Sequence, residues 1–230
     1  MTDSDSIDCN ALQDFESYRY SLELKLDAPA FEETSSPLPD DPLSAFAEAL
    51  SSLFSDMRLQ GAFSAPDRSQ VLLDFEGEEL EWRSIGDRTW VRFGDKWEEQ
   101  EPSASNELLT PEIVCEDIVL DIASSLADAA VEDATINGID AYHYSVDSED
   151  LENIPPLLAS AGSGDLPDDL NFDVWLAKEG LWPVQLSFSA SDTDESGQTV
   201  ELSLDMQVRD INDPGILIEP PPADAETQGS

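Results

Sequence analysis

The residue types that most often perform catalysis are scarce in this chain. His143 is the single histidine among 230 residues, and Cys9 and Cys115 lack the C-x-x-C spacing of redox and zinc sites. In the stretch AYHYS, His143 lies on the strand face opposite Tyr142 and Tyr144, so we expect it to meet solvent or a polar neighbour. Carboxylate pairs are uninformative, because 52 acidic residues place them together by chance. We therefore expect no catalytic residues and no enzyme.

The segment DTDESG is the one candidate metal site. Asp192, Asp194, Ser196 and Gly197 match the opening of a calcium-binding loop. Ser203 stands where such a loop has its bidentate glutamate, and strand patterns flank the segment instead of helices. We expect a solvated hairpin loop, with Asp192 and Asp194 as a minor calcium candidate, and no cofactor.

A disulfide between Cys9 and Cys115 is the other chemistry that the sequence permits. It would close a loop of roughly 100 residues and would imply an oxidising compartment. Two independent reduced thiols are the alternative.

The charge of the chain is extreme, because 52 acidic against 10 basic residues give a formal net charge of −42. This balance argues against nucleic acid as a partner. It favours an acidic, halophilic surface suited to high salt or solubility, with a cation-rich partner or a calcium store as the alternative. Four of the basic residues lie close together and are predicted to form alternating strand surface: Arg83, Arg88, Arg92 and Lys96.

The sequence contains no apolar run near the roughly 20 residues that span a bilayer. The first ten residues, MTDSDSIDCN, lack the basic and apolar segments of a signal peptide, and Asp8 makes Cys9 a poor lipidation site. We expect a soluble chain.

Alternating apolar and polar residues dominate the chain, and this period of two is typical of strands with one buried face. The alternation is clearest in residues 200–209 and 18–26. It also predicts strands at these ranges: 57–64, 69–75, 79–85, 89–93 and 141–146. Sequential hairpins of this number indicate a large antiparallel sheet.

Helical patterns are fewer. In residues 110–130, Thr110 is a predicted N-cap before Pro111. The apolar stripe of that helix is formed by Cys115, Ile118, Val119, Ile122 and Leu126. A second helix is predicted over residues 42–57, and a short third one near Pro155.

One domain is the economical division of the chain. We assign residues 1–14 to an N-terminal tail, 15–222 to a single domain and 223–230 to a disordered C-terminal tail. Residues 28–42 read as a mobile, acidic, Pro-rich surface excursion.

The stretch 172–189 predicts a hairpin whose three-residue loop is Lys178, Glu179 and Gly180. Glycine suits the last position of such a loop because it readily adopts a left-handed conformation. In this register Trp182 lies on the apolar face, whereas Trp175 lies on the opposite face against Pro183. The apolar partners are predicted as follows: Leu176 with Trp182, Val174 with Val184, and Phe172 with Leu186.

Four segments carry a resemblance to a known family: GAFSAPDRSQVLLDFEGEELEWRSIGDRTWVRFGDKWEE, INGIDAYHYSVD, NFDVWLAKEGLWPVQLSFS and MQVRDINDPGILIEPP. Over most of residues 15–222 the chain resembles LppX/LprG-type bacterial lipoproteins of the LolA-like superfamily. The resemblance implies an α+β fold with a strongly curved antiparallel β-sheet, an unclosed half-barrel, and helices packed on its concave face. It also implies a hydrophobic cavity between sheet and helices, and a location in the periplasm or on the cell surface.

We therefore expect a non-enzymatic, extracytoplasmic, monomeric protein that binds an acyl chain or lipid between sheet and helices. An envelope sensor or protein-interaction domain with the same fold and a self-filled core, meeting a protein partner, is the alternative. For each candidate residue alone, core packing competes with ligand binding. The candidates share one strand face: Tyr20, Leu22, Leu24, Leu73, Phe75, Leu80, Trp82, Val174, Trp182, Val184, Leu186, Phe188, Leu202 and Leu204.

Overall fold

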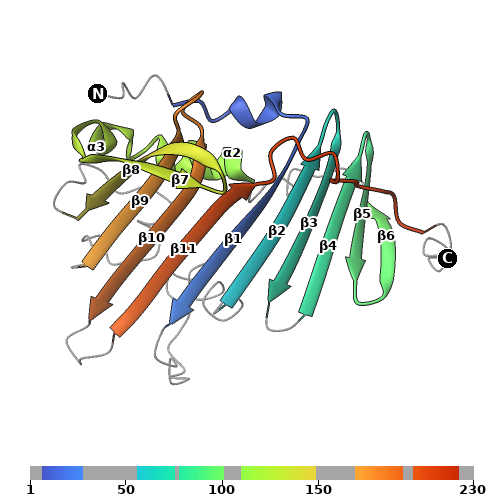
Figure 1. The fold of residues 1–230 in the computed structure, drawn as a ribbon. Coiled ribbons are helices and arrows are strands. Elements are labelled where there is room, and N and C mark those ends of the chain that lie inside the picture. Colours follow the sequence, from blue (N-terminus) through green and yellow to red (C-terminus); the bar gives the residue numbers. More distant parts are fainter. Residues whose placement is uncertain are drawn as a thin grey trace, which may run out of the picture.

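A computed structural model describes residues 7–27, 56–75, 78–100, 110–148, 169–193 and 199–222. These residues form a broad sheet with short helices beside it (Figure 1). The strands are β1 (Ser17–Asp27), β2 (Asp56–Ser64), β3 (Arg68–Phe75), β4 (Glu78–Ile85), β5 (Arg88–Phe93), β6 (Lys96–Gln100), β7 (Val131–Ile136), β8 (Ile139–Asp147), β9 (Asp169–Ala177), β10 (Pro183–Thr193) and β11 (Thr199–Arg209). The helical elements are η2 (Ala11–Asp14), α2 (Pro111–Val114), η4 (Cys115–Val119) and α3 (Ala123–Asp128).

All eleven strands belong to one antiparallel sheet, in the order β6-β5-β4-β3-β2-β1-β11-β10-β9-β8-β7. Each strand from β1 to the edge strand β6 pairs with the next strand in the chain, and so does each strand from the other edge strand, β7, to β11. The first and last strands therefore pair in the middle, and the sheet is unclosed. The large antiparallel sheet is confirmed, and β6 and β7 are strands that the alternation did not predict.

Alternation divides the side chains of the sheet between two faces. The inner face is the one that carries Tyr20 and Leu22 of β1, and the outer face is the one that carries Arg19. Register extends the inner face across the sheet, because Leu22 lies opposite Met206 on β11 and Leu59 on β2. Most inner-face side chains of β1 and β8–β11 are buried in one hydrophobic core.

The predicted helix over residues 110–130 is interrupted. The amide of Leu120 donates to the carbonyl oxygen of Cys115, which makes η4 a π-helical turn between α2 and α3. Thr110 occupies the N-cap position, but its side chain makes no capping hydrogen bond. The predicted stripe is nevertheless confirmed as core, since all its members are buried: Cys115, Ile118, Val119, Ile122 and Leu126.

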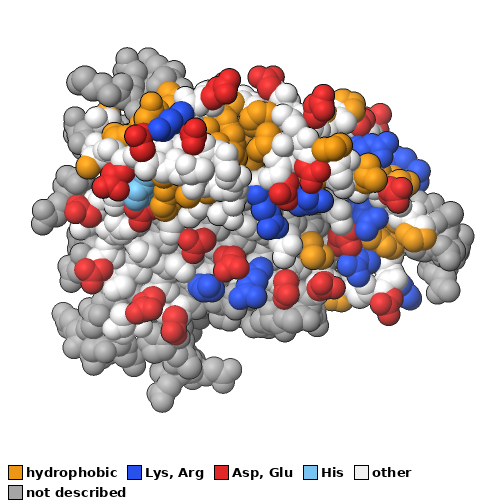
Figure 2. Space-filling model, viewed as in Figure 1, with side chains coloured by type: hydrophobic (Ala, Val, Ile, Leu, Met, Phe, Trp, Pro, Cys, Tyr) orange, Lys and Arg blue, Asp and Glu red, His pale blue; other side chains and the backbone are white. Residues whose placement is uncertain are grey.

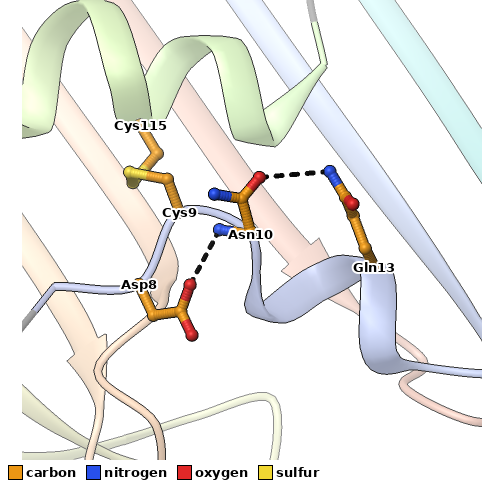
Figure 3. Close-up of a disulfide and its surroundings, with 5 residues drawn as sticks. All are labelled: Asp8, Cys9, Asn10, Gln13 and Cys115. Carbon is orange, nitrogen blue, oxygen red and sulfur yellow. Dashed lines mark hydrogen bonds between the residues drawn. A yellow bond between two sulfur atoms is a disulfide. The ribbon is translucent and has the colours of Figure 1, made fainter.

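Residues 7–14, which the sequence analysis assigns to an N-terminal tail, pack against this core. Leu12 is fully buried, and Cys9 forms a disulfide with Cys115 of η4 (Figure 3). Phe15 then packs edge-on against Trp182, with 5.4 Å between ring centroids. The segment is therefore part of the domain. Its apolar side chains, which a solvent-exposed tail would leave in water, are buried in the core, and the disulfide attaches it covalently to η4.

The chain after β11 crosses the outer face of β2–β4 (Figure 1). Ile216 and Ile218 are buried there. Two arginines of the sheet hold the backbone of this segment: Arg68 donates to the carbonyl oxygen of Ile218 at 2.7 Å, and Arg83 donates to that of Glu219 at 3.0 Å. The segment after β11 therefore packs on the outer face of the sheet near one end of β2–β4.

The turn between β9 and β10 is longer than predicted. The amide of Ala177 donates to the carbonyl oxygen of Trp182, so the loop has four residues, Lys178 to Leu181. Gly180 and Leu181 both have positive φ, 84° and 48°. A four-residue loop alone would place every side chain of β10 on the face opposite to the predicted one. A bulge between Pro183 and Gln185 inserts one extra residue and so returns these side chains to the predicted face.

The predicted partners across this hairpin are therefore wrong, although the predicted faces are right. Val174 lies opposite Leu186, and Phe172 lies opposite Phe188, because the register is shifted by two residues. Trp182 is buried, with 5% of its surface exposed. Trp175 lies on the outer face, where its ring stacks on His143 at 4.4 Å; Pro183 is paired with Leu176 instead.

Met57 belongs to strand β2 and is buried, so the predicted helix over residues 42–57 is wrong at its C-terminal end. Several predictions lie outside the described residues: the remainder of that helix, the excursion over residues 28–42, the helix near Pro155 and the tail over residues 223–230.

Candidate functional site

The inner face of β1 and β8–β11 is occupied by the core of the protein. The helical stripe of residues 114–126 packs into the same cluster of buried side chains. Eight of the fourteen predicted binding residues lie in this cluster, each at most 6% exposed: Tyr20, Leu22, Val174, Trp182, Val184, Leu186, Phe188 and Leu204. Their packing partners are residues of the same chain, so a ligand would reach them only if the helical segment moved.

The inner face stays apolar beyond this core, over β3–β5, but most of its apolar side chains are only half-buried there. We call this area the apolar strip and define it by two neighbouring rows across β3, β4 and β5: Val71, Trp82 and Val91, and Leu73, Leu80 and Phe93. Phe93 is 60% exposed. An exposed phenylalanine within a contiguous apolar surface is typical of a binding surface.

Three of the predicted residues, Leu73, Leu80 and Trp82, belong to the strip. Val91 and Phe93 were not among the predicted residues, although the alternation in residues 89–93 places them on the same face. Leu24 and Leu202 are half-buried against the core cluster, on the neighbouring strands β1 and β11. The side chain of Phe75 lies outside the described residues.

The apolar strip ends in a row of hydroxyl groups. The row that follows Val71, Trp82 and Val91 contains Ser69, Ser84 and Thr89, and the hydroxyl oxygens of Ser84 and Thr89 lie 3.1 Å apart. The inner face of this half of the sheet therefore changes from apolar to polar along the strand direction.

Tyr18 and Phe63 continue the same row on β1 and β2, and their rings stack at 5.3 Å. The Tyr18 hydroxyl donates a 2.6 Å hydrogen bond to Oε1 of Glu112, in the first turn of α2. Burial, and then the negative charge of Glu112, raise the pKa of Tyr18 far above its usual value. Tyr18 is therefore a neutral donor, and a carboxylate lies where the helical segment adjoins the apolar strip.

Gly61 lies opposite Tyr20 and leaves room for its ring. A Cβ atom at position 61 would come within 2.0 Å of two ring atoms of Tyr20. Burial, followed by the charge of Glu112, also raises the pKa of Tyr20. Gly61 and Tyr20 thus form the boundary between the core and the strip.

On the outer face of the same strands a buried carboxylate is held by three side chains. Glu81 accepts hydrogen bonds from Gln70 at 2.6 Å, from Arg83 at 2.7 Å and from Arg92 at 2.9 Å. The Arg83 guanidinium lies 4.7 Å from the ring centroid of Trp97. This cluster stabilises β3–β6 from the outside, and most Lys and Arg side chains of this view lie over this half of the sheet (Figure 2). Of the four residues predicted to form basic strand surface, Arg83, Arg88 and Arg92 lie on the outer face, whereas Lys96 of β6 lies on the inner face, opposite Phe93.

Among the described residues, His143 contacts one carboxylate and one aromatic ring. Its Nε2 lies 2.8 Å from Oδ1 of Asp173, whose other oxygen accepts from Asn171 at 2.7 Å. Trp175 stacks on the imidazole at an interplanar angle of 4°. The predicted polar neighbour is Asp173.

Two open hollows occur elsewhere on the described surface, and neither contains the apolar strip. The first, of about 480 Å³, lies near one end of β1 and β8–β11, where polar residues and the apolar Leu170, Ala190 and Leu202 line it. The second, of about 490 Å³, lies between the β1–β2 end and residues 212–217. Both linings mix polar and apolar groups.

Across the part of the chain that the structure describes, no three His, Cys, Asp or Glu residues are grouped so as to hold a metal ion. The side chain of Asp192 and all of Asp194 lie outside the described residues. No helix within the described ranges is long and apolar enough to cross a membrane.

Comparison with known proteins gives distant structural matches alone. No protein-family model matches the chain, and no curated protein matches it. Among solved structures, the chain is similar to one in the complex of Pseudomonas aeruginosa MucA and MucB, with 14% sequence identity and a TM-score of 0.33. The match covers 98% of this chain and 60% of that chain. A TM-score of this size supports no inference about shared fold or function.

Proposed function

We propose that this protein binds an apolar ligand, an acyl chain or lipid, on the apolar strip of its inner face, and that it carries the ligand without catalysing a reaction. The observation that carries the proposal is the continuation of the apolar inner face past the core. Val71, Leu73, Leu80, Trp82 and Val91 are half-buried there, and Phe93 is 60% exposed. The LolA-like, curved half-barrel implied by the sequence resemblance is the finer form of the same proposal.

Burial of apolar surface would supply the affinity. Each methylene group of an acyl chain that leaves water contributes about 0.8 kcal/mol, and the side chains of the strip lose exposed area as well. The proposed site is the apolar strip beside the core. It is not the layer between the helical segment and the sheet, which the core side chains fill. The buried members of the predicted face, such as Val184 and Leu186 of β10, belong to the core and not to this site.

The disulfide supports a location outside the cytoplasm, and the charge supports a high-salt environment. Cys9 and Cys115 are joined, and disulfides persist mainly in oxidising compartments. A net charge of −42 favours solubility in concentrated salt, which screens repulsion between carboxylates. We propose a halophilic, extracytoplasmic carrier on these grounds.

Native purification followed by organic extraction and mass spectrometry tests the proposal. We expect acyl lipids to accompany the protein and a Trp82→Ser variant to retain much less of them, because a hydroxyl replaces the largest side chain of the strip. Trp175→Ser is the matched control, since Trp175 lies on the outer face. Absence of lipid from the native protein, together with no binding of an apolar fluorescent probe, would rule the carrier function out.

An interaction domain with a self-filled core is the second candidate, and one observation favours it. The layer between the helical segment and β8–β11 is filled, because Val174, Leu176, Val184 and Leu186 are completely buried. In that case the apolar strip would meet a protein instead of a lipid. Equal, negligible lipid content in the native protein and the Trp82→Ser variant, combined with loss of a co-purifying protein from the variant alone, would favour this function.

A further inference from the structure

In the strands that the structure describes, a single basic side chain lies on the inner face of the sheet. Every arginine of these strands, and Lys25, lie on the outer face, whereas Lys96 of β6 lies opposite Phe93 on the inner face. Lys96 therefore stands at the end of the first row of the apolar strip, which contains Leu73, Leu80 and Phe93. The strip thus has a cation at its β6 border, although the chain has only 10 basic residues against 52 acidic ones.

Lys96 differs from the outer-face cations of this half of the sheet in its partners. Arg92, on the opposite face of the adjacent strand, lies 2.8 Å from a carboxylate oxygen of Glu81. Lys96 is exposed and forms no ion pair with a carboxylate of the described residues. Its aliphatic stem can lie along Phe93, which is 60% exposed, while the ammonium group stays in water. The ammonium group is therefore available to a ligand that lies on the strip.

Glu98 is the other charge at this border. It lies opposite Val91, at the end of the second row of the strip, which contains Val71, Trp82 and Val91. Two residues along a strand are about 7 Å apart, and no ion pair joins the side chains of Lys96 and Glu98. A negative group in line with the first row therefore meets Lys96 before it meets Glu98.

The first row also gives a ligand its direction. Toward the middle of the sheet the row continues into Leu59 of β2, which is 4% exposed and belongs to the core. From Leu73 on β3 to Lys96 on β6 the row covers three inter-strand distances, about 14 Å. A single extended acyl chain can fill this span, with its methyl end toward Leu59 and its head group at the solvent-exposed edge of the sheet.

We propose that the ligand is a free fatty acid, whose chain lies across β3–β5 on the first row of the strip and whose carboxylate lies at Lys96. This inference rests on the proposed binding of an apolar ligand. It specifies the chemical class of that ligand and assigns Lys96 as the residue that selects the head group. Lys96 supplies one positive charge, and the two rows of the strip are about 7 Å apart. One chain with one negative charge therefore matches the site better than a lipid with several chains.

Burial of the chain supplies most of the affinity, and the ion pair supplies the selectivity. An exposed ion pair strengthens binding only about two- to fivefold, because water screens it. The net charge of −42 repels every anion at long range, whichever side of the sheet the anion approaches. Variants with the same net charge are therefore the ones to compare, since the long-range repulsion is then equal and the local contribution of Lys96 remains.

Two amphiphiles with the same acyl chain test the assignment. Binding of laurate (anionic) and monolauroylglycerol (neutral) is measured by titration calorimetry below their micellar concentrations, at about pH 8, where the carboxyl group of laurate is ionised. Lys96→Gln removes the inner-face cation. Lys25→Gln is the matched control, because Lys25 is exposed on the outer face and the net charge changes equally. We expect Lys96→Gln alone to weaken laurate binding about two- to fivefold, with monolauroylglycerol nearly unchanged, and Lys96→Arg to keep the affinity for laurate.

A second pair of variants tests the same border with the opposite sign. Glu98→Gln removes the negative charge beside Lys96, and Glu201→Gln, at an exposed position on the outer face of β11, is its control. We expect laurate to bind more tightly to the Glu98→Gln protein than to the Glu201→Gln protein, with monolauroylglycerol bound equally by both.

The outcomes separate the two proposals. An identical ratio of the laurate and monolauroylglycerol affinities in the Lys96→Gln and Lys25→Gln proteins would overturn the assignment of Lys96 and leave the proposed function intact. Binding of monolauroylglycerol without any binding of laurate would overturn the fatty acid as the ligand. If neither amphiphile binds the parent protein, the proposed function itself fails.

Discussion

Tyr18 and Glu112, which are 94 residues apart in the sequence, are joined by a 2.6 Å hydrogen bond between the first strand and the first turn of α2. The bond lies where the helix-covered core meets the apolar strip. It fixes the start of the helical segment relative to β1 and gives the Glu112 carboxylate a hydrogen-bond donor. The contact therefore ties the helical segment to the sheet.

Replacement of Tyr18 by phenylalanine should destabilise the protein. The change leaves the Glu112 carboxylate without the donor that partly replaces water around it, and such a loss costs about 1 to 3 kcal/mol. The free energy of unfolding from urea titration measures the effect. Tyr142→Phe is the control, because Tyr142 is half-buried at the other end of the sheet. Equal effects of the two changes would contradict the importance of the Tyr18–Glu112 bond.

Stability should fall in alkaline solution. The pKa values of Tyr18 and Tyr20 are raised in the folded protein, chiefly by burial, above the ordinary value of about 10. At higher pH the unfolded chain loses these protons while the folded chain keeps them, so the unfolded state binds fewer protons and unfolding becomes easier. The contribution is fully present below about pH 10 and decreases above it.

Urea unfolding at a series of pH values from about 8 to about 11 would show this decrease. The Tyr18→Phe/Tyr20→Phe variant, compared with its own stability at neutral pH, should lose less stability over the same range. A slope for the double variant as steep as that of the parent would show that other groups, such as lysines, cause the alkaline loss.

Removal of the disulfide should weaken the whole domain. Cys9 and Cys115 are 106 residues apart, and in chain-entropy models a bridge of that span contributes about 4 to 5 kcal/mol. We expect the Cys9→Ala/Cys115→Ala variant to lose about 2 to 5 kcal/mol in denaturant unfolding. The parent protein measured under reducing conditions should approach the variant. An unchanged unfolding midpoint would mean that residues 7–14 contribute little beyond their own packing.

The two tryptophans of the β9–β10 hairpin should respond very differently to truncation. Trp182 is 5% exposed and packs against Phe15, so Trp182→Ala should cost about 3 to 5 kcal/mol. Trp175 is half-buried on the outer face and loses mainly its stack on His143, for which about 0.5 to 1.5 kcal/mol is typical. Thermal or urea unfolding measures both. Equal losses would contradict the faces to which the structure assigns these rings.

Local alternation was sufficient to predict much of the sheet. Residues 18–26 and 200–209 read as strands from sequence alone, and the structure pairs them as β1 and β11 with Leu24 opposite Leu204. The sequence also placed Trp182 and Trp175 on opposite faces. These predictions hold because successive side chains of a strand point to opposite sides, a property of the backbone that no distant contact changes.

Register and helix continuity could not be predicted in the same way. The four-residue loop and the bulge after Pro183 each shift the pairing of β9 with β10 by one residue. The two shifts together leave each side chain on its predicted face but opposite a different partner. The π-helical turn that begins at Cys115 contains one more residue than an α-helical turn, and the spacing of the apolar stripe does not reveal this extra residue. The register of the hairpin and the continuity of the helix both depend on which backbone groups form hydrogen bonds. Several similar backbone conformations can satisfy these groups, so the sequence pattern does not select one of them.

The sequence by itself determined which residues form an apolar face, because side-chain type and a period of two are local properties. Only the tertiary structure decided what that face does: Val184 and Leu186 are covered by the helical segment and become core, whereas Trp82 and Phe93 lie beyond it and remain partly exposed. It also decided that Tyr18 meets Glu112 and that the arginines of β1–β5 lie on the opposite face from the strip. Coverage and charge placement depend on which elements pack together, and packing joins residues that are far apart in the sequence.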